Sequence, residues 1–224
     1  QLHHLDEVQA PGDVVLDGIL LTHGHMGHYT GLVHLGQEAA HVQGVPVWVM
    51  PRMRTFLEES APWEQLIRAG NIRLVDLVAD QPVQLAPDLT VTPIEVPHRD
   101  EYSETVAFQV AGPQRTVLWL PDIDGWDAWD RDLADVLGQH DVAWVDGTFF
   151  DESERSERQL SGIAHPRIQQ TMERLAGLPA ALKKRLRFVH LNHSNPVLYP
   201  ESEAHRAVVS AGFQVAREGN SVVL

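Results

Sequence analysis

Three histidines lie within six residues in the stretch LLTHGHMGHYTGL, residues 20–32. His23, His25 and His28 follow an apolar run, so we expect them on a loop that leaves the edge of a sheet. The spacing of two places His23 and His25 on one side of an extended chain, and a turn through the intervening glycines brings His28 to a neighbouring position. Three imidazoles at one point are costly unless a cation or hydrogen bonds satisfy their nitrogen atoms. The stretch therefore predicts a metal-binding loop, and the alternative is a surface histidine cluster.

Further candidate ligands occur where later strands are expected to end. His98 closes the apolar stretch TPIEVPH, Asp122 closes TVLWLPD, and RFVHLNHSNP contains both His190 and His193. Taken singly, each residue is weak evidence for a metal ligand. An aspartate before a helix is an ordinary N-cap residue, and a strand-end histidine is often only a polar group with its hydrogen bonds satisfied. Together with the three-histidine loop they form a ligand set for a metal site. The chain has no cysteine, so nitrogen and oxygen donors would select zinc, manganese or iron.

Short β-branched runs alternate with helical patterns along the chain. Strands are predicted at residues 17–22, 45–50, 71–77, 141–147 and 187–191, with two hairpins at 83–98 and 105–122 that turn at Pro87-Asp88 and Gly112-Pro113. Helices are predicted at residues 30–40, 51–59, 63–69, 126–139, 166–175 and 201–211, with Pro51 and Pro166 in first turns and Gly212 as a stop signal. This order predicts a layered α/β fold in which helices cover sheets.

Length and charge limit the classes of function. The 224 residues, 43% of them hydrophobic, suit one compact domain over residues 1–224. A net charge of -14 opposes binding to a phosphate backbone, so we expect a small-molecule substrate and no nucleic-acid partner. No apolar run approaches the roughly 20 residues of a membrane-spanning helix, and the helix-like start QLHHLDEV lacks a signal-peptide pattern. We therefore expect no membrane association and a cytoplasmic location.

The pattern THGHMGH, followed by His98, Asp122 and His190 at successive strand ends, resembles the metallo-β-lactamase-fold superfamily, whose signature is T-H-x-H-x-D-H and then His, Asp and His. The segments WVDGTFFDE and HLNHSNPVL are similar to the pyrroloquinoline quinone biosynthesis protein B branch, and the likeness covers nearly the whole chain. The resemblance implies an αββα sandwich with a metal site at one edge. Only one predicted strand precedes the histidine loop, so we expect N-terminal strands to be missing. The open sheet edge would then favour a homo-oligomer.

The resemblance also assigns the metal ligands. It groups five histidines and one aspartate by ion: His23, His25 and His98 for the first ion, His28 and His190 for the second, and Asp122 as the bridge. His193 is the alternative to His190, which we prefer, and Asp124 is the rival of Asp122. The implied cofactor is Zn²⁺ in one tightly held site with a second, weaker site, and Mn²⁺ or Fe²⁺ is the alternative.

Gly27 departs from the family pattern, since most members have an aspartate there that binds the second metal and orients the attacking water. Without this carboxylate we expect one tightly held ion or a strongly asymmetric pair. A structural explanation for the glycine is also open, because glycine permits a positive φ and close approach of another group.

A Lewis-acidic cation makes its bound water a nucleophile near neutral pH, so the leading hypothesis is hydrolysis of a small-molecule ester, lactone or phosphodiester. Asp122 would take part in this step. His165, in GIAHPRI, resembles the position of a proton-donating histidine in phosphodiesterase members, or it only precedes the helix that starts near Pro166. Asp146, in WVDGT, either orients a ligand histidine or merely ends a strand.

Two rival functions remain open. An iron-dependent oxygenase or hydroxylase fits the resemblance to the quinone-biosynthesis branch, and a metal-binding protein that has lost catalysis fits the loss of acid at Gly27. Substrate contacts are equally open. Trp126 and Trp129 either line the cleft or pack against the sheet, and Arg99 and Tyr102 either contact a polar substrate or belong to an ordinary loop.

Overall fold

The computed structural model describes residues 16–154 and 164–224 of the chain, so the helix-like start QLHHLDEV lies outside the described residues. The chain divides into two compact units. Of the described residues, unit 1 comprises 16–81 and 100–105, and unit 2 comprises 82–99, 106–154 and 164–224.

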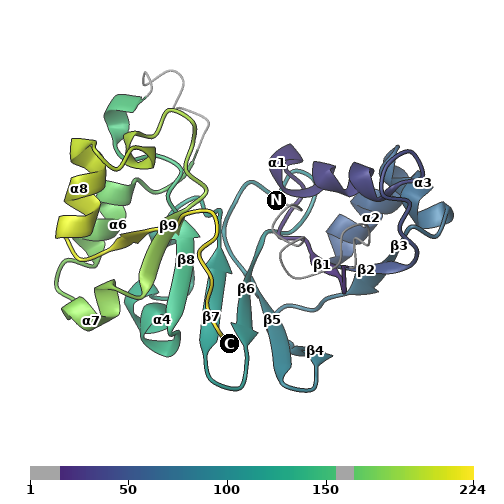
Figure 1. Ribbon diagram of the computed structural model, residues 1–224, viewed down its shortest axis with the longest axis horizontal. Coiled ribbons are helices and arrows are strands. Elements are labelled where there is room, and N and C mark those ends of the chain that lie inside the picture. Colours follow the sequence, from purple (N-terminus) through teal and green to yellow (C-terminus); the bar gives the residue numbers. More distant parts are fainter. Residues whose placement is uncertain (1–15, 155–163) are drawn as a thin grey trace. The chain divides into compact units, whose positions relative to one another are not determined.

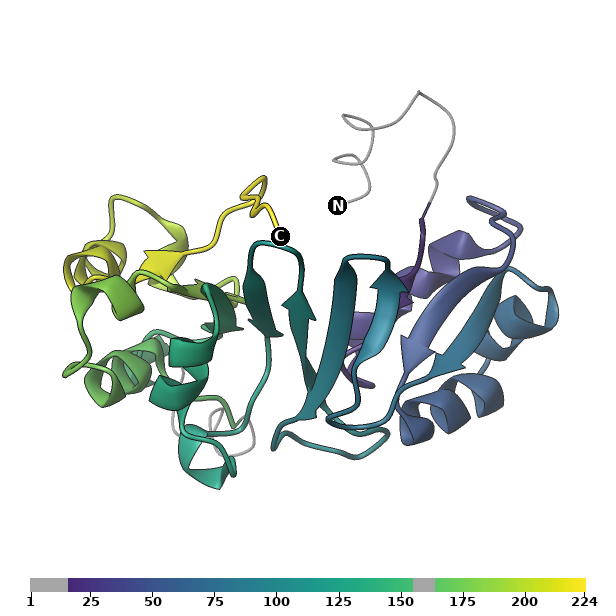
Figure 2. The same cartoon turned by 90° about the horizontal axis from the view of Figure 1, so that it is seen from below.

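Unit 1 contains a parallel three-stranded sheet in the order β1-β2-β3 with helices beside it (Figure 2). Its elements are β1 (Ile19–Leu20), α1 (Met26–Tyr29), η2 (Thr30–Leu35), β2 (Val45–Val49), α2 (Pro51–Glu59), α3 (Trp63–Arg68) and β3 (Ile72–Asp76). Val47 and Val49 of β2 are fully buried and pack with Leu32 of η2 and Leu57 of α2 in one hydrophobic cluster. Both valines face the same side because side chains alternate along a strand.

Unit 2 contains a seven-stranded mixed sheet in the order β10-β9-β8-β7-β6-β5-β4. Its strands are β4 (Val83–Ala86), β5 (Leu89–Glu95), β6 (Val106–Ala111), β7 (Thr116–Leu120), β8 (Val142–Asp146), β9 (Leu186–Val189) and β10 (Gln214–Val215). Strands β4 to β7 form the two predicted hairpins, and β7 to β10 pair in parallel (Figure 1). Because β5, β7, β8 and β9 run in the same direction, their carboxyl ends lie at the same edge of the sheet.

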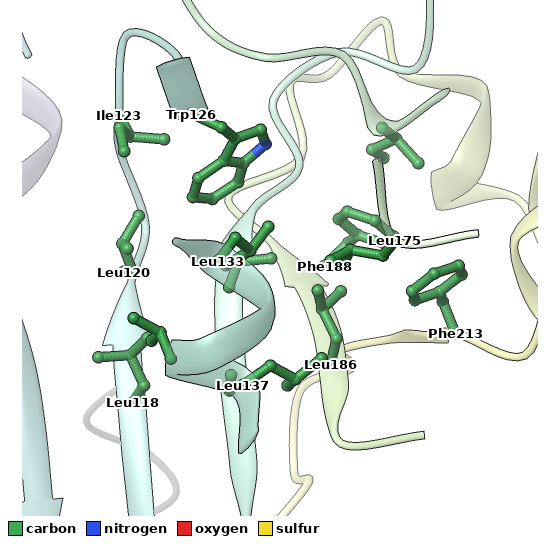
Figure 3. Packing of buried hydrophobic residues seen from close by; sticks show 14 of the residues in the cluster. Leu118, Leu120, Ile123, Trp126, Leu133, Leu137, Leu175, Leu186, Phe188 and Phe213 are labelled. Carbon is green, nitrogen blue, oxygen red and sulfur yellow. The ribbon is translucent and has the colours of Figure 1, made fainter. Parts of the chain in front are cut away.

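The helices of unit 2 are η3 (Trp126–Ala128), α4 (Leu133–Gln139), η4 (Glu152–Glu154), α6 (Ile168–Arg174), α7 (Ala180–Lys183), η5 (Pro196–Leu198) and α8 (Glu203–Ser210). Figure 3 shows side chains of β7, α4 and β9 packed in one core: Leu118, Leu120, Leu133, Leu137, Leu186 and Phe188. Each such side chain contributes roughly 1.5–3 kcal/mol when it is fully buried. This core holds the strands whose ends carry the candidate ligands.

The two tryptophans that follow Asp122 are buried in the same core, with ring centroids 6.3 Å apart. The indole N–H of Trp126 donates to Thr171 Oγ1 at 2.8 Å, and that of Trp129 donates to the Glu95 carbonyl at 3.1 Å. Trp129 therefore packs against β5 of the sheet, as one of the two predictions has it, and Trp126 contacts α6.

Three helix predictions are wrong in detail. The helix expected over residues 30–40 is a short 3-10 helix. The helix expected over residues 126–139 splits, because the carboxylate of Asp132 caps a new helix. Pro166 lies outside the first turn of α6, since Arg167 is the N-cap residue.

Other boundaries are confirmed. Pro51 is the first residue of α2, and Gly212 follows α8 with a φ of 95°, a conformation that favours glycine. The short elements α1, α7 and β10 are not predicted, because two to four residues carry too little periodicity. Within residues 16–154 and 164–224, no helix combines the length and apolar character that a membrane crossing needs.

Candidate metal centre

Four candidate residues of unit 2 follow strands whose carboxyl ends share one edge of the sheet. His98 follows β5, Asp122 follows β7, Asp146 is the last residue of β8, and His190 directly follows β9. His165 joins them from the segment before α6. The sheet order therefore brings together residues that are far apart in the sequence.

Asp122 lies at the centre of this group and is only 3% exposed. Its Oδ1 atom lies 3.9 Å from His98 Nε2, 4.0 Å from His165 Nδ1 and 3.5 Å from His190 Nδ1. One ligand atom from each of His98, Asp122 and His165 lies within 4.8 Å of the others. Imidazole nitrogens around a carboxylate are the donor set that zinc and iron bind, so these residues fit a divalent cation.

Asp124 holds His98 in place. Its Oδ1 atom lies 2.8 Å from His98 Nδ1, while His98 Nε2 is the ring nitrogen nearer Asp122. A carboxylate on one ring nitrogen fixes the tautomer and leaves the other nitrogen to bind a metal. The structure thus gives Asp124 a role beside Asp122 and not in its place.

Asp146 is fully buried and accepts four hydrogen bonds. The donors are Ile123 N at 3.1 Å, Thr148 N at 2.9 Å, Thr148 Oγ1 at 2.7 Å and His165 Nδ1 at 2.7 Å. Burial raises the pKa of Asp146, but the bond and charge of His165 and the Thr148 donors outweigh it and hold this pKa below its ordinary value. Asp146 therefore ends β8 and also holds His165 through a hydrogen bond.

The same contacts act on His165 and Asp122. Burial lowers the pKa of His165, but the bond to Asp146 and the charges of both aspartates raise it above its ordinary value. For Asp122, burial and then the charge of Asp146 raise the pKa to about 7, against the opposing charges of His165 and Arg99. Without a cation, Asp122 therefore holds its proton up to neutral pH.

His190, and not the exposed His193, belongs to this group. Its Nδ1 atom lies 3.0 Å from Thr148 Oγ1, and its φ of 60° is the left-handed conformation that few residues other than glycine adopt. Burial lowers the pKa of His190, which favours the neutral imidazole that binds metal.

In unit 1 the three predicted histidines also lie together. The ring centroids of His23 and His25 are 4.6 Å apart, and those of His23 and His28 are 4.2 Å apart. His25 Nε2 contacts Glu101 Oε2 at 3.1 Å, and His23 Nδ1 contacts Thr22 Oγ1 at 3.1 Å. The prediction that this stretch brings its imidazoles together is confirmed.

Gly27 lies in α1, and a Cβ added to it would meet nothing within 4 Å. It is also not among the glycines with a positive φ. Neither a positive φ nor the packing of another protein segment therefore requires glycine at this position.

A cavity of about 590 Å³ in unit 2 has His165, Trp126 and Asp124 in its wall, together with residues of α6. Trp126 is thus both a core residue and part of this wall. Arg99 acts on Asp122 through its charge, and Tyr102 of unit 1 is exposed beside Phe56.

The sequence pattern does not single out Thr148 or Arg167. Thr148 closes an Asx-type turn on Asp146, and the spacing of two in D-G-T is the signal that could have found it. Arg167 is buried and donates to the His165 carbonyl at 2.8 Å. Its guanidinium also lies over the Phe149 ring at 5.1 Å, a contact that no local pattern indicates.

A layered α/β fold with histidines and aspartates at the ends of its strands defines a class of metal-dependent proteins. Residues 2–221 match the family model of the Beta-lactamase superfamily domain, and the chain belongs to this superfamily. It has the metallo-β-lactamase fold, as the sequence resemblance predicts.

Similar proteins support the predicted branch. Coenzyme PQQ synthesis protein B of Klebsiella pneumoniae (strain 342) is 26% identical over 251 residues, which span 100% of this chain and 78% of that protein. The crystal structure of Zn²⁺-bound PqqB from Methylobacterium extorquens matches with a TM-score of 0.69 and 19% identity, covering 92% of this chain and 71% of that one. CmlA, a diiron β-hydroxylase from Streptomyces venezuelae, matches with a TM-score of 0.53 and 14% identity, covering 90% and 44%. The resemblance to PqqB is confirmed.

Proposed function

We propose that the protein is a metal-dependent hydrolase of a small-molecule ester, lactone or phosphodiester. The observation that carries this proposal is His165, which lies in the wall of a cavity and beside Asp122 and is held by a 2.7 Å hydrogen bond to the buried Asp146. A buried carboxylate that holds a histidine at a cavity wall suits that histidine to give a proton to a leaving group.

His98, Asp122 and His190 would hold the metal ion in unit 2. The resemblance assigns His23, His25 and His28 to the same centre, although the structure describes them within unit 1. A bound divalent cation supplies Lewis acidity, which activates water and polarises the substrate. Asp124 keeps the Nδ1 proton of His98 engaged, so that Nε2 remains the ligand nitrogen.

His165 is the proposed proton donor. Its Nδ1–H group stays hydrogen-bonded to Asp146, so the proton given to the substrate comes from Nε2. Arg167 fixes the backbone of His165 through the carbonyl oxygen, which limits how the imidazole moves at the cavity wall. The acidic composition supports a small molecule as the substrate over a nucleic acid.

The first test is the metal content of protein purified without added metal, measured by elemental mass spectrometry. We expect about one equivalent of zinc or manganese, lost in His98→Gln and in His23→Ala and retained in His193→Gln, whose histidine is exposed. Retention in His98→Gln or in His23→Ala would contradict the assignment of that unit's histidines.

The second test is hydrolysis of chromogenic ester, lactone and phosphodiester probes. His165→Gln should lower kcat by about a hundredfold while the metal content stays unchanged, because a proton donor acts in the chemical step. An unchanged kcat in this variant would remove His165 from the mechanism, and a metal-loaded protein without activity on any probe would contradict the hydrolase.

An iron-dependent oxygenase is the second candidate, favoured by likeness over the whole chain to proteins named for coenzyme PQQ synthesis. Iron as the dominant metal, combined with no hydrolysis of any probe, would select this candidate. Zinc as the dominant metal would exclude it, since zinc has no redox chemistry.

A further inference from the structure

We propose that Thr148 is a positioning residue that relays the charge of Asp146 to His190 and fixes the His190 imidazole with its proton on Nδ1. His190 Nε2 then carries the lone pair that a metal ion binds. The relevance to metal binding rests on the proposed function, but the position of the proton does not.

Hydrogen bonds hold the turn that carries Thr148. Gly147 N donates to the Val189 carbonyl at 2.9 Å, one residue before His190. Asn195 Nδ2 donates to the Gly147 carbonyl at 2.8 Å and to the Thr148 carbonyl at 3.2 Å. These bonds keep the threonine hydroxyl at a constant distance from the end of β9.

The Thr148 hydroxyl has one proton and three neighbouring atoms. His165 Nδ1, at 3.3 Å, uses its own proton in the hydrogen bond to Asp146, so two of the three could receive the hydroxyl proton. Asp146 Oδ1 lies at 2.7 Å and His190 Nδ1 at 3.0 Å. Asp146 accepts four hydrogen bonds and is held in its ionised form, so the bond to it is charge-assisted and the stronger of the two. The Thr148 hydroxyl therefore donates its hydrogen bond to Asp146.

Because its only proton is used in the hydrogen bond to Asp146, the Thr148 oxygen can only accept a hydrogen bond from His190. Asp122 Oδ1 also lies 3.5 Å from His190 Nδ1. A ring nitrogen that faces the Thr148 oxygen, which can only accept, must carry the proton of that hydrogen bond. Neutral His190 is therefore the Nδ1–H tautomer.

Each of the three histidines around Asp122 then donates a hydrogen bond from Nδ1, but the acceptor differs. His98 and His165 each place Nδ1 on a carboxylate, Asp124 at 2.8 Å and Asp146 at 2.7 Å. His190 places Nδ1 on the threonine hydroxyl instead. Through Thr148, one buried carboxylate thus orients two imidazoles.

Thr148→Val tests this role, since valine keeps the shape and removes the hydroxyl, and Thr148→Ser restores the hydroxyl. The readout is the long-range ¹H–¹⁵N correlation spectrum of the histidine rings in metal-free protein at about pH 8, where neutral imidazole dominates. A His190→Gln variant identifies the His190 signals.

In wild type and in Thr148→Ser we expect a protonated-type shift for His190 Nδ1 and an unprotonated-type shift for Nε2. In Thr148→Val the two shifts should exchange or average, because the Nε2–H form is favoured in a histidine without such a bond. An unchanged His190 pattern in Thr148→Val overturns the proposal, and so does an Nε2–H pattern in wild type.

Zinc affinity, measured by competition with a chromophoric chelator, gives an independent readout. Thr148→Val should weaken zinc binding by about tenfold, and Thr148→Ser should restore it. Thr105→Val is the matched control, since Thr105 is buried and its hydroxyl has no hydrogen-bond partner among the described residues. Equal losses in Thr105→Val and Thr148→Val would overturn the proposal. Absence of hydrolysis with a normal tautomer result would count only against the proposed function.

Discussion

Both units contain histidines that are candidate metal ligands, but the two units position these histidines differently. In unit 1 the histidines are five residues apart at most, and His25 contacts the carboxylate of the half-exposed Glu101. In unit 2 the ligands come from separate strand ends and are held by buried carboxylates, above all the fully buried Asp146.

The difference shows what each arrangement requires of the fold. A local histidine loop needs only a short turn, so its stability depends little on the charges around it. A group assembled from strand ends places ionisable groups in the interior, where each unpaired charge costs several kcal/mol. Unit 2 should therefore respond strongly to changes in charge and pH, and unit 1 should respond weakly.

The largest expected effect is the pH dependence that Asp122 confers on the metal-free protein. The pKa of this carboxyl is about 7 in the folded state and 3.8 ordinarily, so between these values the folded state binds more protons. The free energy of unfolding should therefore fall as pH rises through this window, by up to roughly 4 kcal/mol.

Urea unfolding in a chelator, at about pH 4 and about pH 7, measures this dependence. Asp122→Asn should show a flatter dependence than wild type, because the difference between the two isolates this one group. Glu101→Gln should follow the wild-type curve. If Asp122→Asn and wild type run parallel, the buried carboxyl does not titrate in this window.

Asp146→Asn should lower the free energy of unfolding by about 3 kcal/mol at neutral pH, because an amide group would face donors that now point at a carboxylate. Glu101→Gln in unit 1 should change the same quantity by less than about 0.5 kcal/mol, since its pair with His25 is exposed. Urea unfolding compares both variants with wild type. Equal, small changes would erase the distinction between the units.

Two glycines give a smaller contrast that does not involve charge. A Cβ at Gly147 would lie 2.9 Å from Phe188 Cβ and 3.0 Å from the Val189 carbonyl, so Gly147→Ala should cost about 2 kcal/mol. Gly27 lies in α1 with open space around its Cα, so Gly27→Ala should increase stability by roughly 0.5 kcal/mol. Thermal unfolding checks both, and a stable Gly147→Ala variant would show that the turn after β8 can shift.

The same contrast explains what the sequence predicts. The histidine loop and both hairpins follow from local patterns, since His23, His25 and His28 are neighbours and the turns at Pro87-Asp88 and Gly112-Pro113 have strong signals. The preference for His190 over His193 agrees with the structure, which places His190 beside Asp122. Local patterns suffice where the contact is itself local.

The contacts among distant residues could not be predicted. The role of Asp124 depends on its hydrogen bond to His98, 26 residues away, and that of Thr148 depends on His190, 42 residues away. These pairs form because β5, β7, β8 and β9 end at one edge of the sheet, which strand order decides. The 3-10 form of residues 30–35 also lies beyond a periodicity argument.

A further contrast between the units concerns metal affinity and involves Asp124, which touches His98 and not the proposed metal ion. Asp124→Asn keeps the shape of the side chain but removes the charge on His98 Nδ1, so zinc binding should weaken by about tenfold, or about 1.4 kcal/mol. Glu101→Gln, which changes the corresponding contact of His25, should weaken it by less than about twofold because the pair is exposed to solvent. Competition with a chromophoric chelator measures both. A larger loss in Glu101→Gln would mean that the histidine loop of unit 1, and not the strand ends of unit 2, limits metal affinity.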